Sequence, residues 1–114
     1  MRPPSSVLYV PGPPRWARDA LIQELRTRLP EPVQQAFLFG SHARETADGD
    51  SDIDLIFVVD TDVPSVRRPL AFVDVLQGLG ALDLLVYTPA EWEGLNRAPS
   101  SFMEQIRAEL LRIK

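Results

Sequence analysis

Between residues 15 and 29 the apolar positions recur every three or four residues, which is the spacing of one helix face. They are Ala17, Leu21, Ile22, Leu25 and Leu29. Pro30 and Pro32 follow at once, and proline cannot continue a helix. The pattern predicts a helix over residues 15–29.

Three later apolar runs are typical of strands. The first covers residues 33–39 and ends at Gly40, the second covers 53–59, and the third covers 81–87. Because the second run is apolar on both faces, it is predicted to lie in the centre of a sheet. Residues 66–79 are predicted to form a helix between the second and third strands.

Two capping boxes follow the third strand. The run from Thr88 to Glu91, with proline at the first helical position, predicts a short helix through about Leu95. The run from Ser101 to Glu104 predicts a final helix. That helix would carry Phe102, Ile106, Leu110 and Ile113 on one face.

The lengths of the connections predict how the strands pair. Only eleven residues separate Gly40 from Asp52, which favours an antiparallel pair, whereas residues 61–80 are long enough for a crossover to a parallel strand. The expected fold is α/β (α+β), with a mixed three- to four-stranded sheet flanked by helices. Residues 1–14 contain five prolines and are predicted to be an extended arm that packs as an edge strand or contacts a partner, and residues 15–114 a single domain.

Composition excludes several classes of protein. The chain has no cysteine, so neither a disulfide framework nor a thiolate metal site is possible. The net charge is −4 with no basic patch, so direct binding of nucleic acid is not expected. No apolar run approaches a membrane span and no signal peptide is evident, so a cytoplasmic location is expected.

The candidate chemistry lies in acidic residues at the predicted strand ends. Asp52 and Asp54 are one residue apart, so they would point the same way about 6–7 Å from each other. In the predicted sheet, Asp83 lies at the same edge, surrounded by apolar residues. Three carboxylates there suit Mg²⁺, and two such ions can support an in-line phosphoryl or nucleotidyl transfer. The alternatives are an acidic turn for the first two residues and a partly exposed strand-start acid for Asp83.

The turn before these acids could hold phosphate. Gly40 permits close backbone approach, and Ser41 stands where a helix would begin. Arg44 could bind phosphate or form a structural ion pair with a neighbouring carboxylate. His42 is expected to be solvent-facing or hydrogen-bonded.

The motif Gly-Ser-x-Ala-Arg, followed by Ser-Asp-Ile-Asp-Leu and a later strand aspartate, resembles the minimal nucleotidyltransferase domain of the polymerase-β-like superfamily. The resemblance implies transfer of a nucleoside monophosphate, expected to be AMP from ATP, to an acceptor hydroxyl with two Mg²⁺ ions. It implies that Asp52, Asp54 and Asp83 are the catalytic metal ligands and that Gly40 and Ser41 contact phosphate. Members of the family commonly have glycine where this chain has Glu45, whose carboxylate either weakens nucleotide binding or points to solvent.

The small size leaves little surface for an acceptor. The family's free-standing minimal members typically act with a separate helical HEPN partner, as antitoxins that transfer AMP to the toxin. The resemblance therefore favours the antitoxin of such a pair, which adenylylates or masks its toxin. Two alternatives are a catalytically weak antitoxin that only binds its partner, and a transferase acting on an aminoglycoside-type small molecule.

Overall fold

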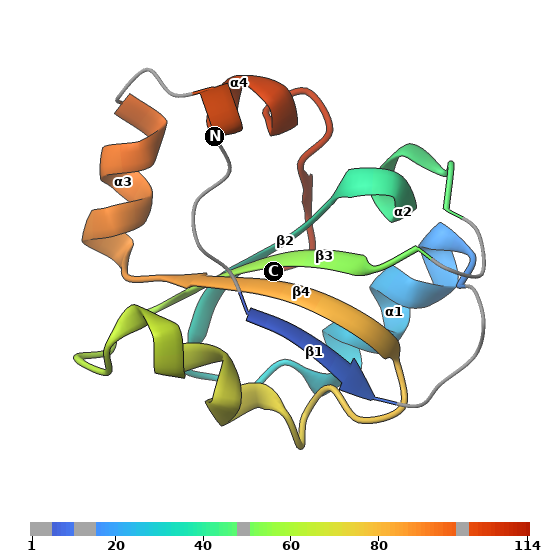
Figure 1. Ribbon diagram of the computed structural model, residues 1–114, viewed down its shortest axis with the longest axis horizontal. Helices are drawn as coiled ribbons and strands as arrows, with labels where there is room; N and C mark the ends of the chain where they lie inside the picture. The colour runs from blue at the N-terminus through green and yellow to red at the C-terminus, as the bar shows by residue number, and fades with distance from the viewer. Residues whose placement is uncertain (1–5, 11–15, 48–50, 98–100) are drawn as a thin grey trace.

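A five-stranded mixed sheet forms the centre of the computed structural model, which describes residues 6–10, 16–47, 51–97 and 101–114 (Figure 1). The strand order is β1-β4-β3-β2-β5. The strands are β1 (Ser6–Val10), β2 (Val33–Phe39), β3 (Ile53–Val59), β4 (Gly80–Tyr87) and β5 (Leu111–Arg112). β2 and β3 are antiparallel and β3 and β4 are parallel, so the predicted mixed α/β fold is confirmed. The sheet has five strands instead of the predicted three or four, because β1 and β5 are added at its edges.

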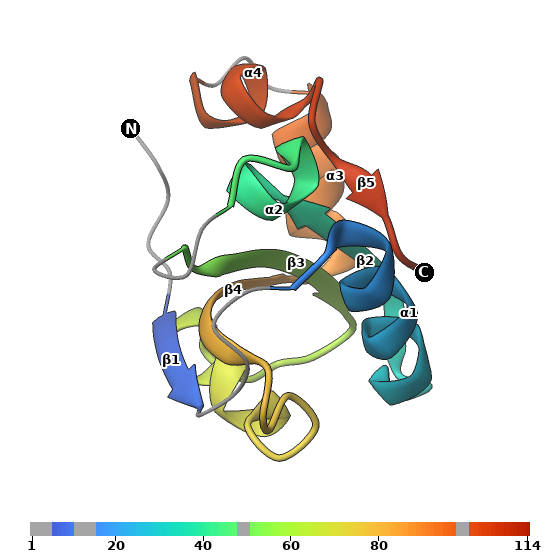
Figure 2. The same ribbon diagram turned by 90° about the vertical axis from the view of Figure 1, so that its right-hand side faces the viewer.

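Helices cover both faces of this sheet. On one face, α1 (Arg18–Arg28) and the 3-10 helix η1 (Ser65–Phe72) pack against alternate residues of β3. On the other face, α3 (Pro89–Arg97) and α4 (Ser101–Ile106) cover the remaining strand residues. Figure 2 shows α4 and the segment after β3 on opposite sides of the sheet. β3 is therefore buried from both sides, as its apolar pattern predicts.

The predicted helix over residues 66–79 is wrong. The chain forms only η1, and turns occupy the residues from Val73 to Gly78. Pro69 lies inside this segment, where it lacks an N–H group and would clash with the preceding turn of an α-helix. A 3-10 helix therefore replaces the α-helix.

The predicted final helix is also wrong beyond its first turns. α4 ends at Ile106, and β5 then pairs with β2 in an antiparallel arrangement. Ile106 packs on the α3 side of the sheet, whereas Ile113 packs on the α1 side. The two residues that helical spacing placed on one face thus lie on opposite faces. The free edge of β2 supplies main-chain hydrogen bonds, including Ile113 N–H to Ala36 carbonyl at 2.7 Å.

The first capping box is present as predicted. The Thr88 hydroxyl accepts from the Glu91 N–H at 3.2 Å, and a Glu91 carboxylate oxygen accepts from the Thr88 N–H at 2.8 Å. The corresponding side chain of Ser101 lies outside the part of the chain that is described.

The proline-rich segment supplies an edge strand. β1 pairs antiparallel with β4, while residues 1–5 and 11–15 lie outside the described residues. The division into an arm and a domain stays a prediction. No helix in the described ranges has the length and apolar character needed to span a bilayer.

Candidate active site

Gly40 makes the turn from β2 into the short helix α2 (Gly40–Arg44). Its φ angle is +76°, in the left-handed region that favours glycine. A Cβ atom at this position would collide with the carboxylate of Asp54, which lies on the paired strand β3. The backbone of the turn and a predicted catalytic carboxylate are therefore in direct contact, and only glycine permits it.

The predicted acids do not all lie together. Asp54 and Asp83 are register partners on the parallel strands β3 and β4, so their side chains share one face of the sheet. Asp83 is buried, with 5% of its surface exposed, and Asp54 is partly exposed. Asp52 is exposed in the segment just before β3. Among the described residues, no three acidic, histidine or cysteine side chains are gathered closely enough to hold a metal ion, so the metal triad stays a prediction.

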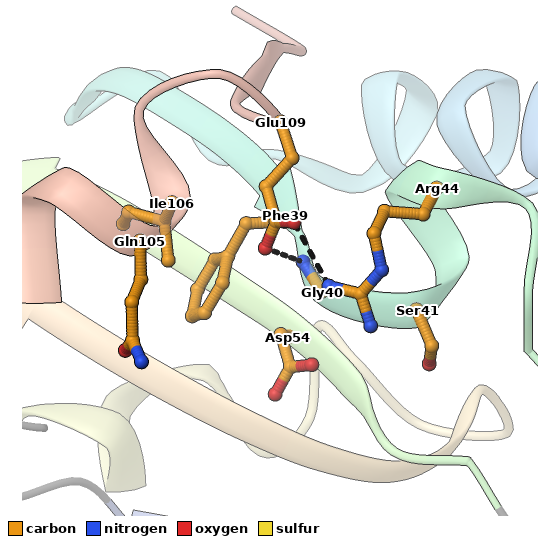
Figure 3. A pocket seen from close by; sticks show the side chains of 8 residues that line it. All are labelled: Phe39, Gly40, Ser41, Arg44, Asp54, Gln105, Ile106 and Glu109. Carbon is orange, nitrogen blue, oxygen red and sulfur yellow. Dashed lines mark hydrogen bonds and ion pairs between the residues drawn. The ribbon is translucent and has the colours of Figure 1, made fainter.

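A pocket of about 470 Å³ opens between the turn and the C-terminal segment (Figure 3). It is lined by Phe39, Gly40, Ser41, Arg44, Asp54, Gln105, Ile106 and Glu109. The sequence-predicted phosphate-binding residues and Asp54 thus share one cavity. Asp52 and Asp83 are not among its lining residues.

Glu109 was not predicted from the sequence as a site residue. One of its carboxylate oxygens accepts from the Gly40 N–H at 3.1 Å, and the other accepts from Arg44 Nη1 at 2.8 Å. Two roles were predicted for Arg44, phosphate binding and a structural ion pair. The structure shows the ion pair, and its partner is Glu109. No motif surrounds Glu109, and the residue is 69 positions from Gly40, so the sequence carried no signal of this contact.

His42 is buried beneath the turn, with 3% of its surface exposed. Its Nδ1 lies 3.0 Å from the Asp52 carbonyl oxygen. Because a carbonyl can only accept, Nδ1 carries the proton and donates it. Burial lowers the pKa of His42, and this hydrogen bond and the nearby Asp52 charge oppose that shift. Of the two predicted roles, the hydrogen-bonded one holds, and it ties α2 to the segment that carries Asp52.

Glu45 ends α2 in the left-handed conformation, with φ 62° and ψ 30°. Its side chain is 62% exposed, and one carboxylate oxygen lies 3.6 Å from Arg18 Nη1 on α1. Glu45 does not line the pocket. Its carboxylate is therefore directed to solvent and Arg18 rather than into the pocket.

Asp54 of the mixed sheet thus meets the turn that carries Gly40 and Ser41. The chain belongs to the nucleotidyltransferase domain family, because the family model described as "Nucleotidyltransferase domain" matches residues 18–110. Among curated proteins, no sequence matches the chain.

Solved structures that are similar to this one include the following two. A "putative nucleotidyltransferase" from Sulfolobus solfataricus superposes with a TM-score of 0.56 at 15% sequence identity, over 84% of this chain and 81% of that one. This likeness concerns the fold alone. A toxin-antitoxin structure with AMP-PNP aligns at a TM-score of 0.44 and 20% identity, over 87% of this chain and 73% of that one, which is too weak a match for any argument.

Proposed function

We propose that the protein transfers a nucleoside monophosphate, AMP from ATP, to an acceptor hydroxyl in a Mg²⁺-dependent reaction in the cytoplasm. The observation that carries the proposal is the contact between the Gly40 turn and Asp54, at the edge of a pocket and beside the register partner Asp83. A cation bound between two carboxylates on neighbouring strands offsets their mutual repulsion. In nucleotidyl transfer, the reaction for which the chain's family is named, such a cation would bind the nucleotide substrate.

Each site residue has a proposed part. Asp52, Asp54 and Asp83 would hold two Mg²⁺ ions, for which carboxylate oxygens are suitable ligands. Bound Mg²⁺ would neutralise the triphosphate and lower the pKa of the acceptor hydroxyl. The Gly40 N–H, the Ser41 hydroxyl and the Arg44 guanidinium would orient the terminal phosphates, because all three are hydrogen-bond donors that line one pocket.

For the acceptor, we propose a HEPN-type toxin, so that the chain acts as an antitoxin that adenylylates its partner. The support is the resemblance of the motif at Gly40–Arg44 and Ser51–Leu55 to minimal nucleotidyltransferases.

The test uses α-labelled ATP, Mg²⁺ and the product of the adjacent gene. We expect label on the partner protein, and we expect Asp54→Asn to lower labelling at least ~100-fold because the site loses a charged ligand. Asp62→Asn is the matched control, since it makes the same chemical change at an exposed residue outside the pocket.

Other outcomes identify the alternatives. Label only on an added aminoglycoside would favour the small-molecule transferase. Protection of cells by Asp54→Asn as complete as that by the unmodified chain would favour an antitoxin that acts by binding alone. Absence of both labelling and ATP binding would overturn the proposal.

A further inference from the structure

We propose that Glu109 is an internal competitor for the nucleotide, occupying the phosphate-binding groups of the free protein. This inference rests on the proposed function, because it concerns the same pocket. Glu109 would thereby lower nucleotide affinity, although it lies outside the sequence motif.

The contacts of Glu109 are those that a phosphate would need. The Gly40 N–H and the Arg44 guanidinium are the two donors that it engages, one with each carboxylate oxygen. Carboxylate and phosphate oxygens are both anionic acceptors and prefer the same charged or main-chain donors. A phosphate therefore cannot use these two donors while Glu109 holds them.

The surroundings of Glu109 allow it to be displaced. The residue lies in the turn between α4 and β5, and the Glu109 N–H donates to the Ile106 carbonyl at 2.9 Å. This main-chain bond and the pairing of β5 with β2 fix the turn independently of the carboxylate. Figure 3 shows the Glu109 side chain extending from this turn to Gly40 and Arg44. Its displacement by a phosphate would therefore leave these backbone contacts of the turn in place.

The Arg44 side chain is accessible to an incoming phosphate. It is 50% exposed, whereas the Glu109 side chain is 17% exposed. Nucleotide binding would thus replace the Glu109 carboxylate with a phosphate at the half-exposed Arg44 guanidinium. The free energy of the two Glu109 contacts is subtracted from the binding free energy of the nucleotide.

The experiment measures binding of Mg²⁺-ATP and of inorganic triphosphate by titration calorimetry to the unmodified chain and to Glu109→Gln. The variant keeps the shape of the side chain and removes its charge, so we expect its dissociation constant to be roughly three- to tenfold lower. Glu104→Gln is the matched control, an exposed glutamate on α4 that is absent from the pocket, and it should bind like the unmodified chain.

Equal or weaker binding by Glu109→Gln, with ATP bound by the unmodified chain, would overturn the competitor role and leave the proposed function standing. If neither protein binds ATP, both proposals fail.

A second measurement needs no variant that might misfold. In amide NMR spectra of the unmodified chain, saturating inorganic triphosphate should shift the Gly40 and Glu109 signals and leave the Leu21 signal in place. A Gly40 signal that does not move at saturation contradicts the exchange.

Discussion

Glu45 combines an unfavourable backbone conformation with an exposed side chain. A left-handed conformation costs a residue with a Cβ atom about 1–2 kcal/mol, and glycine avoids most of this cost. The long contact of the carboxylate with Arg18, at 3.6 Å on the surface, offsets little of it. The residue that departs from the family's common glycine is thus a strained helix end outside the pocket.

We expect Glu45→Gly to raise the free energy of unfolding by about 0.5–1 kcal/mol, measured by denaturant titration. The affinity for Mg²⁺-ATP should stay within about twofold, because Glu45 lies outside the pocket. Glu45→Ala separates strain from charge, since it removes the carboxylate and keeps the Cβ atom. A stabilisation by alanine equal to that by glycine would show that charge, not conformation, is responsible.

At the scale of elements, Arg68 joins three segments of the chain. Its side chain is buried, with 8% of the residue exposed, and donates to the Val63 carbonyl at 2.7 Å, the Val86 carbonyl at 3.1 Å and Glu91 Oε1 at 2.6 Å. The bond from Arg68 is the main cause of the lowered pKa of Glu91. Because Glu91 also caps α3, one arginine holds η1, the end of β4 and the start of α3 together.

Arg68→Met should lower the free energy of unfolding by about 2–4 kcal/mol, because it leaves two carbonyls and a carboxylate without their donor. Arg67→Met is the matched control on the same 3-10 helix, where the side chain is exposed, and its effect should stay within about 0.5 kcal/mol. Chemical denaturation of both variants measures the difference. Equal effects of the two substitutions on the free energy of unfolding would mean that the hydrogen bonds of Arg68 contribute nothing specific to stability.

Elements differ in how far the sequence determines them. The strand at 53–59 and the capping box at Thr88 could be predicted, because each rests on residues adjacent in the chain. β5 could not, because two residues form it only where the edge of β2 is free to pair. Gly40 could likewise be assigned to the candidate site, because its motif is a run of adjacent residues. Glu109 could not, because the turn after α4 brings it to Gly40 from 69 positions away.

For the whole molecule, His42 should govern the pH dependence of stability near neutrality. It is the only histidine, and burial lowers its pKa from the ordinary value of 6.5. Below that pH the unfolded chain binds a proton that the folded chain resists, so stability falls as the pH decreases from about 6.5 toward the lowered pKa.

We therefore expect the free energy of unfolding to decrease between pH 7.5 and pH 5.5. His42→Asn keeps a side-chain N–H donor for the Asp52 carbonyl and cannot titrate, so its stability should be nearly constant over this range. A decrease of the same size in both proteins would assign the effect to other groups.

The two edge strands of the sheet also determine the order in which parts of the fold can form. β1 and β5 come from residues 6–10 and 111–112, and each pairs with a strand far away in sequence. Contacts between residues far apart in the sequence form slowly, because a long loop must close before the contacts stabilise the chain. During synthesis, the Gly40 turn and β3 would emerge from the ribosome well before Glu109 does. The pocket should therefore be among the last parts of the fold to mature, and refolding experiments should detect its formation later than that of the β2–β3 pair.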